Sequence, residues 1–266
     1  MKFFRKIYMF LIFLFLYAPI FVLMVFSFND SKSRATWHGF TFKWYHRLFE
    51  NNDILSAFYS TMLIAAISSV IATILGTMAA VGIMKSKKWQ RKMIMNITNL
   101  PMINPEIVTG VSLMLLFVFL YNRFGIFKPG IVTLIFAHTT FCLPYVILSV
   151  MPKLRQMDSH IYEAALDLGC NPTKSFFKVV LPQIMPGIVT GLIMSFTMSI
   201  DDFVISYFTG GTTQTLPIAV YSMTRKMVSP EINALSTILF LVVFVLLIVI
   251  NLRREKDKNS SIYSEY

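Results

Sequence analysis

Charged residues are scarce in this sequence of 266 residues. Only 14% of the residues are charged, whereas soluble domains carry about 25%. Hydrophobic residues make up 56%, which is more apolar surface than a soluble fold of this length can bury. The shortage of charge therefore excludes a soluble enzyme, a disordered chain and a secreted disulfide scaffold, and it indicates an integral membrane protein.

Cysteines and catalytic motifs are also lacking. Cys142 lies in an apolar run and Cys170 in a basic segment, so the two form neither a disulfide pattern nor a metal-ligand pattern and are expected to fill space. The sequence has no phosphate-binding loop, no HExxH motif and no nucleophile–base set. We therefore expect no enzyme activity, metal or cofactor in this chain, and any pumping must draw its energy from a partner or an ion gradient.

Six long apolar runs are present, each close to the roughly 20 residues that cross a bilayer as a helix. The expected fold is an all-α, polytopic membrane protein. The first run is longer than the core of a signal peptide and no small-x-small site follows it, so we expect a retained anchor. The six expected spans are Ile7–Phe28, Phe58–Met84, Ile94–Tyr121, Ile131–Met151, Ile184–Phe208 and Ile232–Leu252.

The basic residues fall outside these spans and are divided unequally between the two sides. Sixteen of the 24 lie in the N-terminal end, in the loops after spans two and four, and in the tail. The positive-inside rule then makes both termini cytoplasmic, and topology explains the net charge of +11 without a nucleic-acid partner. The expected organisation is a cytoplasmic segment 1–6, a membrane domain 7–252 with a cytoplasmic loop 152–183, and a cytoplasmic tail 253–266.

That cytoplasmic loop is long enough for helices of its own. We predict a helix over Ser159–Leu168, with a cap at Asp158 or Ser159 and a left-handed end at Gly169. A second helix is predicted after Pro172, because proline suits the first turn of a helix. An ordinary surface helix between two spans is the alternative to a functional role for this segment.

The loop also carries the order E-A-A, then G, then L-P. This order resembles the EAA motif of ABC importer permeases, although Cys170 stands where that family often has a smaller residue. The resemblance implies a type I importer permease of MetI-like architecture, with a coupling helix that docks on a cytosolic ATPase. It also implies that ATP and Mg²⁺ are bound by that ATPase. The coupling residues it implies are Glu163, Ala164, Ala165, Gly169, Leu181 and Pro182.

Further segments narrow the resemblance. Leu16–Ile20, Trp37–Thr41, Ser199–Asp202 and Pro230–Ala234 are similar to the PotC-type permeases of spermidine/putrescine importers. The resemblance implies a protein that lies in the lipid bilayer of the bacterial cytoplasmic membrane and imports polyamines across it. The implied partners are a PotB-like second permease, two PotA-like ATPase subunits and a PotD-like extracytoplasmic binding protein. The alternatives are an importer of another small solute, an ion-coupled secondary carrier and a non-transporting scaffold.

Three of the 13 acidic residues, Glu106, Asp201 and Asp202, lie inside expected spans. A charge near the bilayer centre costs at least about 2.5–3.5 kcal/mol, and no lysine or arginine inside the spans is available to pair with these acids. The helical rise places Glu106 near the midplane and the two aspartates nearer the outer leaflet. We therefore expect a staggered acidic path for a multivalent organic cation.

Each of these residues also has a packing alternative. The alternative for Glu106 is a hydrogen bond to backbone groups that Pro105 leaves without a partner. The span is expected to bend or break at this proline. The alternative for one of the two aspartates is to cap a helix or to pair with the second permease. His138 is interpreted as a proton relay or as a hydrogen-bonded packing residue. The aromatic candidates for cation–π contacts, as opposed to packing, are Tyr145, Tyr207 and Tyr221.

Overall fold

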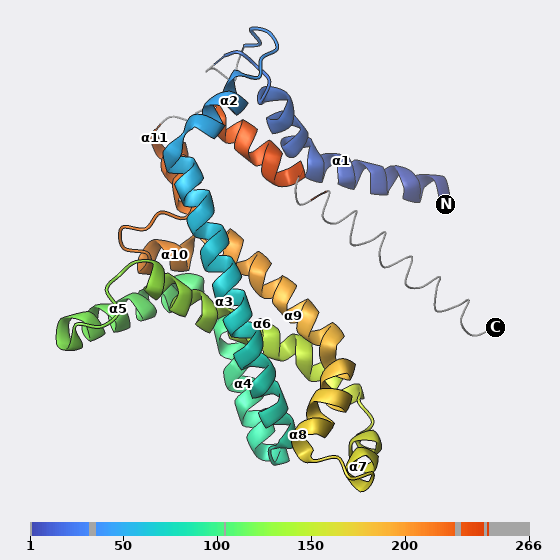
Figure 1. The fold of residues 1–266 in the computed structure, drawn as a ribbon. Helices are drawn as coiled ribbons and strands as arrows, with labels where there is room; N and C mark the ends of the chain where they lie inside the picture. Colours follow the sequence, from blue (N-terminus) through green and yellow to red (C-terminus); the bar gives the residue numbers. More distant parts are fainter. Residues whose placement is uncertain (1, 32–35, 104, 227–229, 242–243, 245–266) are drawn as a thin grey trace. The chain divides into compact units, whose positions relative to one another are not determined.

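The structure is a computed structural model, and it describes residues 2–31, 36–103, 105–226, 230–241 and 244. Across these ranges the chain forms helices and loops, with one isolated antiparallel bridge between Asn29 and Phe40. The chain divides into two compact units (Figure 1). One unit comprises Met1–Ile54 and Val220–Tyr266, and the other comprises Leu55–Ala219.

The helices are α1 (Lys2–Phe26), α2 (Lys43–Glu50), α3 (Asn52–Lys85), α4 (Lys88–Ile103), α5 (Glu106–Phe124), α6 (Ile131–Gln156), α7 (Ser159–Asp167), α8 (Pro172–Ser175), the π-helix η1 (Phe176–Val180), α9 (Leu181–Asp201), α10 (Val204–Thr209) and α11 (Leu216–Lys226). The first, second and fourth expected spans correspond to α1, α3 and α6, and short helices lie between the longer ones.

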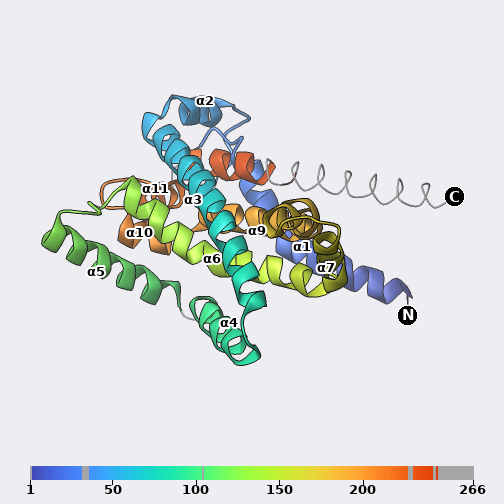
Figure 2. The same cartoon turned by 60° about the horizontal axis from the view of Figure 1, so that its bottom comes forward.

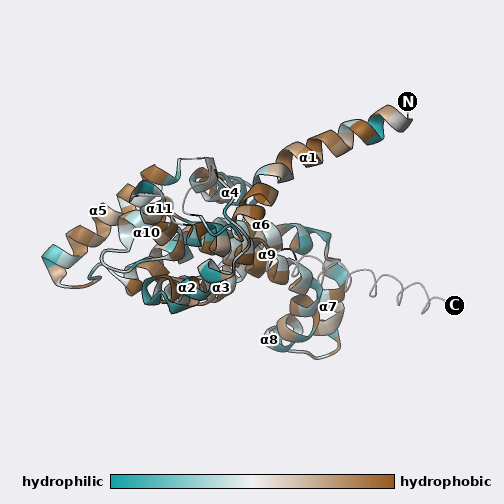
Figure 3. Cartoon of the chain, turned by 90° about the horizontal axis from the view of Figure 1, so that it is seen from above, coloured by the Kyte–Doolittle hydropathy of each residue, from teal (hydrophilic) through white to brown (hydrophobic). Residues whose placement is uncertain are grey.

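The unit that holds the chain ends is organised, in its described part, around the end of α1. The Trp44 indole on α2 donates a hydrogen bond of 2.7 Å to the Asn29 carbonyl, and the Tyr45 hydroxyl lies 2.7 Å from Ser27 Oγ. Along α1 the hydrophobic side chains are exposed (Figure 3). Such a surface suits a helix that faces lipid or another subunit.

The second unit is built on the contact between α6 and α9 (Figure 2). Gly187 and Gly191 of α9 lie four residues apart and face α6. A Cβ atom on Gly187 would lie 2.9 Å from the carbonyl oxygen of Ser149, and one on Gly191 would lie 3.2 Å from the Cα of Val146. The glycines therefore let the two backbones approach closely, as small residues do in membrane helix pairs.

Two further close contacts complete the described packing of this unit. A Cβ on Gly76 of α3 would lie 2.7 Å from the side chain of Val146, and one on Gly110 of α5 would lie 3.1 Å from the Phe208 ring of α10. The buried apolar core is drawn chiefly from α3 and α6, with smaller contributions from α5, α9 and α10. The short helix α10 thus packs between α5 and α6.

Five described helices are long and apolar enough to cross a membrane, and a shorter apolar helix runs over Glu231–Leu241. The protein is therefore an all-α, multi-pass membrane protein. The expected third span is divided between α4 and α5. The expected fifth span, Ile184–Phe208, is displaced: continuous helix runs from Pro172 to Asp201, and α10 is separate. The expected sixth span after Leu241, apart from Phe244, and the tail 253–266 lie outside the described residues.

Candidate functional site

The chain changes direction at the two adjacent aspartates. Helix α9 ends at Asp201, and Asp202 has an extended backbone with φ −67° and ψ 116°. The Asp202 carboxylate accepts hydrogen bonds from the backbone N–H of Ser206, at 2.8 Å, and of Ile205, at 3.3 Å. Asp202 therefore caps α10 and satisfies donors that the start of a helix leaves free.

The two aspartates occupy opposite environments. Asp202 is buried, with 2% of its side chain exposed, whereas Asp201 is exposed. The two neighbours differ because Asp201 still belongs to α9, whereas Asp202 has left the helix and its carboxylate bonds to the backbone at the start of α10. Within the described part of the chain, Asp201 makes no ion pair or hydrogen bond through its carboxylate. Asp201 is thus the exposed and unpaired member of the two aspartates.

His138 on α6 lies beside the capping carboxylate. Its Nδ1 atom is 2.7 Å from Ser199 Oγ and its Nε2 atom is 3.0 Å from Ser206 Oγ. The Asp202 carboxylate is 3.5 Å from Nε2, and only 2% of the His138 side chain is exposed. Of the two roles considered for His138, the structure places it in a hydrogen-bonded packing position.

Glu106 is the first residue of α5, directly after Pro105. It is exposed, and it lies one turn before Gly110, whose backbone contacts α10. Within the described residues, the Glu106 carboxylate forms no ion pair. Glu106 thus stands at the start of a helix and not in the middle of a continuous span, because Pro105 lacks the N–H that would continue α4.

The three aromatic candidates have different surroundings. Tyr145 is half-buried and packs edge-on against Phe141. Tyr207 on α10 is exposed and contacts the ring of Phe208. Tyr221 belongs to the other unit, and its ring already carries the Arg225 guanidinium at 5.8 Å. Glu106, the two aspartates, Tyr145 and Tyr207 all belong to the unit of Leu55–Ala219.

The segment 152–183 folds into short helices close to those that its sequence predicts. Helix α7 covers Ser159–Asp167, and the Asp158 side chain accepts a hydrogen bond of 2.9 Å from the His160 N–H. Gly169 has φ +83°, in the left-handed region that favours glycine. Both the cap and the left-handed end are confirmed. Figure 3 shows hydrophilic residues on and around α7, as expected of a segment outside the membrane.

The six predicted coupling residues lie on or beside α7 and at the start of α9. Glu163 is exposed, and its carboxylate lies 3.6 Å from the His160 ring. Ala164, Gly169 and Pro182 are exposed, whereas Ala165 and Leu181 are half-buried. The α7 surface therefore exposes Ala164 and two carboxylates, those of Glu163 and Asp167, and Leu181 packs against the core of the unit.

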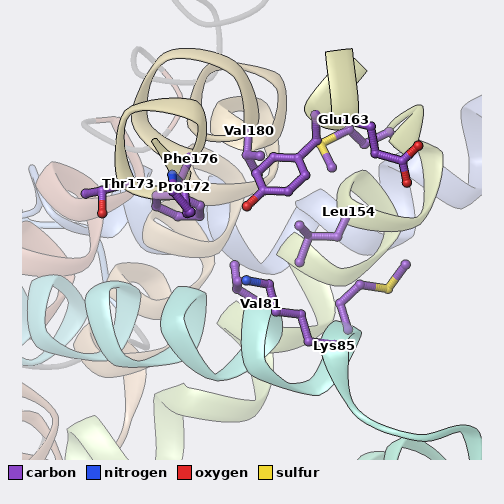
Figure 4. A pocket seen from close by; sticks show the side chains of 11 residues that line it. Val81, Lys85, Leu154, Glu163, Pro172, Thr173, Phe176 and Val180 are labelled. Atoms are coloured by element: carbon purple, nitrogen blue, oxygen red, sulfur yellow. The ribbon is translucent and has the colours of Figure 1, made fainter. Parts of the chain in front are cut away.

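A cavity of about 470 Å³ lies behind this loop, where α3, α6, α7 and α8–η1 meet. Its lining is mainly apolar and includes Val81, Leu154 and Phe176, with Lys85 and Glu163 also present. Figure 4 shows the Glu163 carboxylate directed away from Phe176 and Val180. The cavity lies between α7 and the helices α3 and α6.

Sequence reasoning missed the serines that surround His138. Ser199 and Ser206 were not singled out, and Ser68 of α3 lies 3.2 Å from Ser199 Oγ. A signal was present, because Gly187, Gly191, Ser195 and Ser199 recur every four residues on one face of α9. Of this stripe, the two glycines make the close contact with α6 and Ser199 makes a polar contact with it.

The apolar helices, the close helix packing and the break between α9 and α10 describe a helical membrane protein, and the family match defines its class as a membrane transport permease subunit, not an enzyme. Residues 72–254 match the family described as binding-protein-dependent transport system inner membrane component. The chain belongs to this family.

The relatives of the chain include named permeases. The chain is 41% identical over 238 residues to the putrescine transport system permease protein PotI of Escherichia coli K12, covering 88% of this chain and 85% of the relative. It is 38% identical over 252 residues to the spermidine/putrescine transport system permease protein PotC of the same strain, covering 94% of each. A PotC protein of Haemophilus influenzae is 34% identical over 258 residues, which are 97% of this chain and 98% of that protein.

Solved structures share the fold. A chain of a bacterial ABC transporter involved in the import of the acidic polysaccharide alginate matches with a TM-score of 0.72 and 13% identity, over 95% of each chain. A chain of an amino acid ABC transporter with histidines matches with a TM-score of 0.56 and 20% identity, over 79% of this chain and 98% of that one. At these identities, the likeness establishes the architecture of ABC importer permeases alone.

Proposed function

We propose that this chain is a permease subunit of an ATP-driven importer that moves spermidine or putrescine across the bacterial cytoplasmic membrane. The observation that carries the proposal is the placement of Glu106 and Asp201. Both residues are exposed and lie at helix ends in the Leu55–Ala219 unit, and neither forms an ion pair with any described residue. Relatives named for putrescine and spermidine transport support the same substrate class.

The chemistry of the cargo fits these acids. A polyamine carries two or more positive charges at neutral pH and must shed part of its hydration shell to cross. Exposed carboxylates offset that loss, and separate acids let the cation step inward without a single tight site. Tyr145 and Tyr207 add aromatic faces for cation–π contact on the same path.

The proposed assembly contains a second PotB-like permease, two PotA-like ATPase subunits that bind ATP and Mg²⁺, and a PotD-like extracytoplasmic binding protein. Both termini, 1–6 and 253–266, are cytoplasmic, and 7–252 is the membrane domain. The coupling loop 152–183 faces the ATPase. The proposed contacts are Glu163, Ala164, Ala165 and Gly169, with Leu181 and Pro182 passing the movement to α9.

The test is uptake by the reconstituted complex in liposomes, with the binding protein outside and ATP inside. We expect ATP-dependent accumulation of labelled spermidine or putrescine, and none when this chain is omitted or ATP is replaced by a non-hydrolysable analogue. Accumulation of a neutral solute or an amino acid without any polyamine would contradict the substrate. Uptake driven by an ion gradient in liposomes that hold this chain alone would contradict the importer itself.

A further inference from the structure

A buried polar cluster surrounds the break between α9 and α10. Its centre is the His138 imidazole, which has one serine hydroxyl at each ring nitrogen. Beyond Ser199 the contacts continue to Ser68, which also donates to the Ile64 carbonyl at 2.6 Å. The cluster therefore joins side chains from α3, α6, α9 and α10 at one point.

Because the cluster is buried, each of its polar groups needs a hydrogen-bond partner. His138, Ser68, Ser199 and Ser206 are each at most 2% exposed, and a buried polar group without a partner costs about 1–3 kcal/mol. Either imidazole tautomer is satisfied, because a serine hydroxyl donates or accepts as required. The imidazole thus needs no net charge to stay in place, and removing it leaves two hydroxyls with fewer partners.

The cluster acts on the break through Ser206. The Ser206 hydroxyl meets His138, and the Ser206 backbone N–H donates to Asp202. Asp202 is held by the start of α10, and His138 acts on this cap through the Ser206 side chain. Because the start of α10 holds Asp202 inward, α9 ends at Asp201, and the Asp201 side chain is exposed at that helix end.

We propose that His138 is a positioning residue of the transport pathway. With Ser199 and Ser206 it holds the Asp202 cap, and the cap sets the direction of the Asp201 carboxylate toward the cation. The two adjacent aspartates then have different roles, since Asp201 meets the cargo and Asp202 maintains the break. The identity of that cargo rests on the function proposed above.

The first experiment measures the accessibility of position 201 without any substrate. Asp201→Cys is introduced into the assembled complex in nanodiscs, in a Cys170→Ser background where the remaining thiol of this chain, Cys142, is buried. Its rate of reaction with a charged, water-soluble thiol reagent is recorded. We expect rapid reaction, and a rate about tenfold lower when His138→Ala is added.

Two variants separate positioning from general damage. His138→Gln keeps one hydrogen-bonding end and should restore part of the rate, whereas Ser206→Ala should resemble His138→Ala and add little to it. Thr140→Ala is the matched control, because Thr140 is exposed on the same helix and bonds only to its own helix at Phe136. It should leave the rate unchanged.

The outcomes are distinct. An unreactive Cys at 201, or an equal rate with and without His138, overturns the positioning proposal even if polyamine uptake is normal. If the wild-type complex moves no polyamine while His138→Ala still slows labelling, the function proposed above fails and the positioning role stands. In the transport assay, we expect His138→Ala to lower the maximal rate per assembled complex about tenfold, with the affinity for the loaded binding protein unchanged.

Discussion

Gly187 on α9 lies so close to Ser149 on α6 that a Cβ atom would come within 2.9 Å of the Ser149 carbonyl oxygen. The obstacle is backbone, which cannot rotate away as a side chain does. Any side chain at Gly187 therefore separates the two helices that form the centre of the Leu55–Ala219 unit.

Gly187→Ala should destabilise the protein by about 1–3 kcal/mol through overpacking. Gly82→Ala is the control, because nothing lies within 4 Å of a Cβ at that helical position. Both changes bring the same gain in helix propensity, so their difference isolates the contact. The measurement is the midpoint temperature of the detergent-solubilised complex. Equal midpoints for the two variants would show that α6 and α9 are not in close contact.

Helix α7 and the break at Asp201 show what the sequence could and could not predict. The ends of α7 were predicted to within one residue, because Asp158 and Gly169 act on their own immediate neighbours. The break after Asp201 has no proline or glycine beside it, and apolar residues flank it on both sides. Its partners are distant in sequence, since His138 bonds across 61 residues to Ser199. Contacts between residues so far apart in the sequence cannot be predicted from local sequence patterns.

Glycine at position 169 should be required for its backbone conformation and not for space. Its φ is +83° and nothing lies within 4 Å of a Cβ there. Gly169→Val should lower ATP hydrolysis stimulated by the loaded binding protein about tenfold, because a left-handed valine costs about 1–2 kcal/mol. Gly169→Asn should retain most activity, since asparagine tolerates this region. Equal activity of the two variants would contradict the requirement for a left-handed turn.

Glu163 should matter for docking and not for folding. Its contact with His160 is 3.6 Å long and both side chains are largely exposed, so it adds little to stability. Glu163→Lys should leave the amount of this chain in the membrane unchanged and reduce its co-purification with the ATPase. The control is Asp167→Lys, the same charge reversal on an exposed residue one turn further along α7. Equal loss in both variants would indicate nonspecific repulsion.

The orientation of the chain in the membrane can be tested directly by labelling introduced cysteines. We expect Lys88→Cys and Arg155→Cys to react with an impermeant thiol reagent only from the cytoplasmic side, and Thr212→Cys only from outside, because most of the basic residues lie on the cytoplasmic side. The background carries Cys170→Ser, and buried Cys142 is retained. Reaction of position 155 in intact cells would show that the topology is the reverse of the one expected. The coupling loop would then lie on the side of the membrane opposite to the ATPase.

The last prediction concerns the acids themselves. Glu106→Gln and Asp201→Asn keep side-chain size and remove charge, and each should slow spermidine uptake about tenfold, as expected for the loss of about 1.4 kcal/mol of stabilisation during passage. Asp202→Asn should slow uptake for a different reason, because it weakens the cap of α10, and the Asp201/Asp202 double change should be nearly inactive.

Asp30→Asn is the charge-matched control, since Asp30 is half-exposed and paired with Lys43 at 3.4 Å. Uptake is measured in the reconstituted complex at several spermidine concentrations, with the amount of assembled complex and the affinity of the binding protein determined in parallel. Because Asp201 is exposed and Asp202 is buried, the two single variants should also differ in assembly, with only Asp202→Asn lowering it. If the double variant assembles normally and transports at the wild-type rate, the carboxylates do not guide the cation.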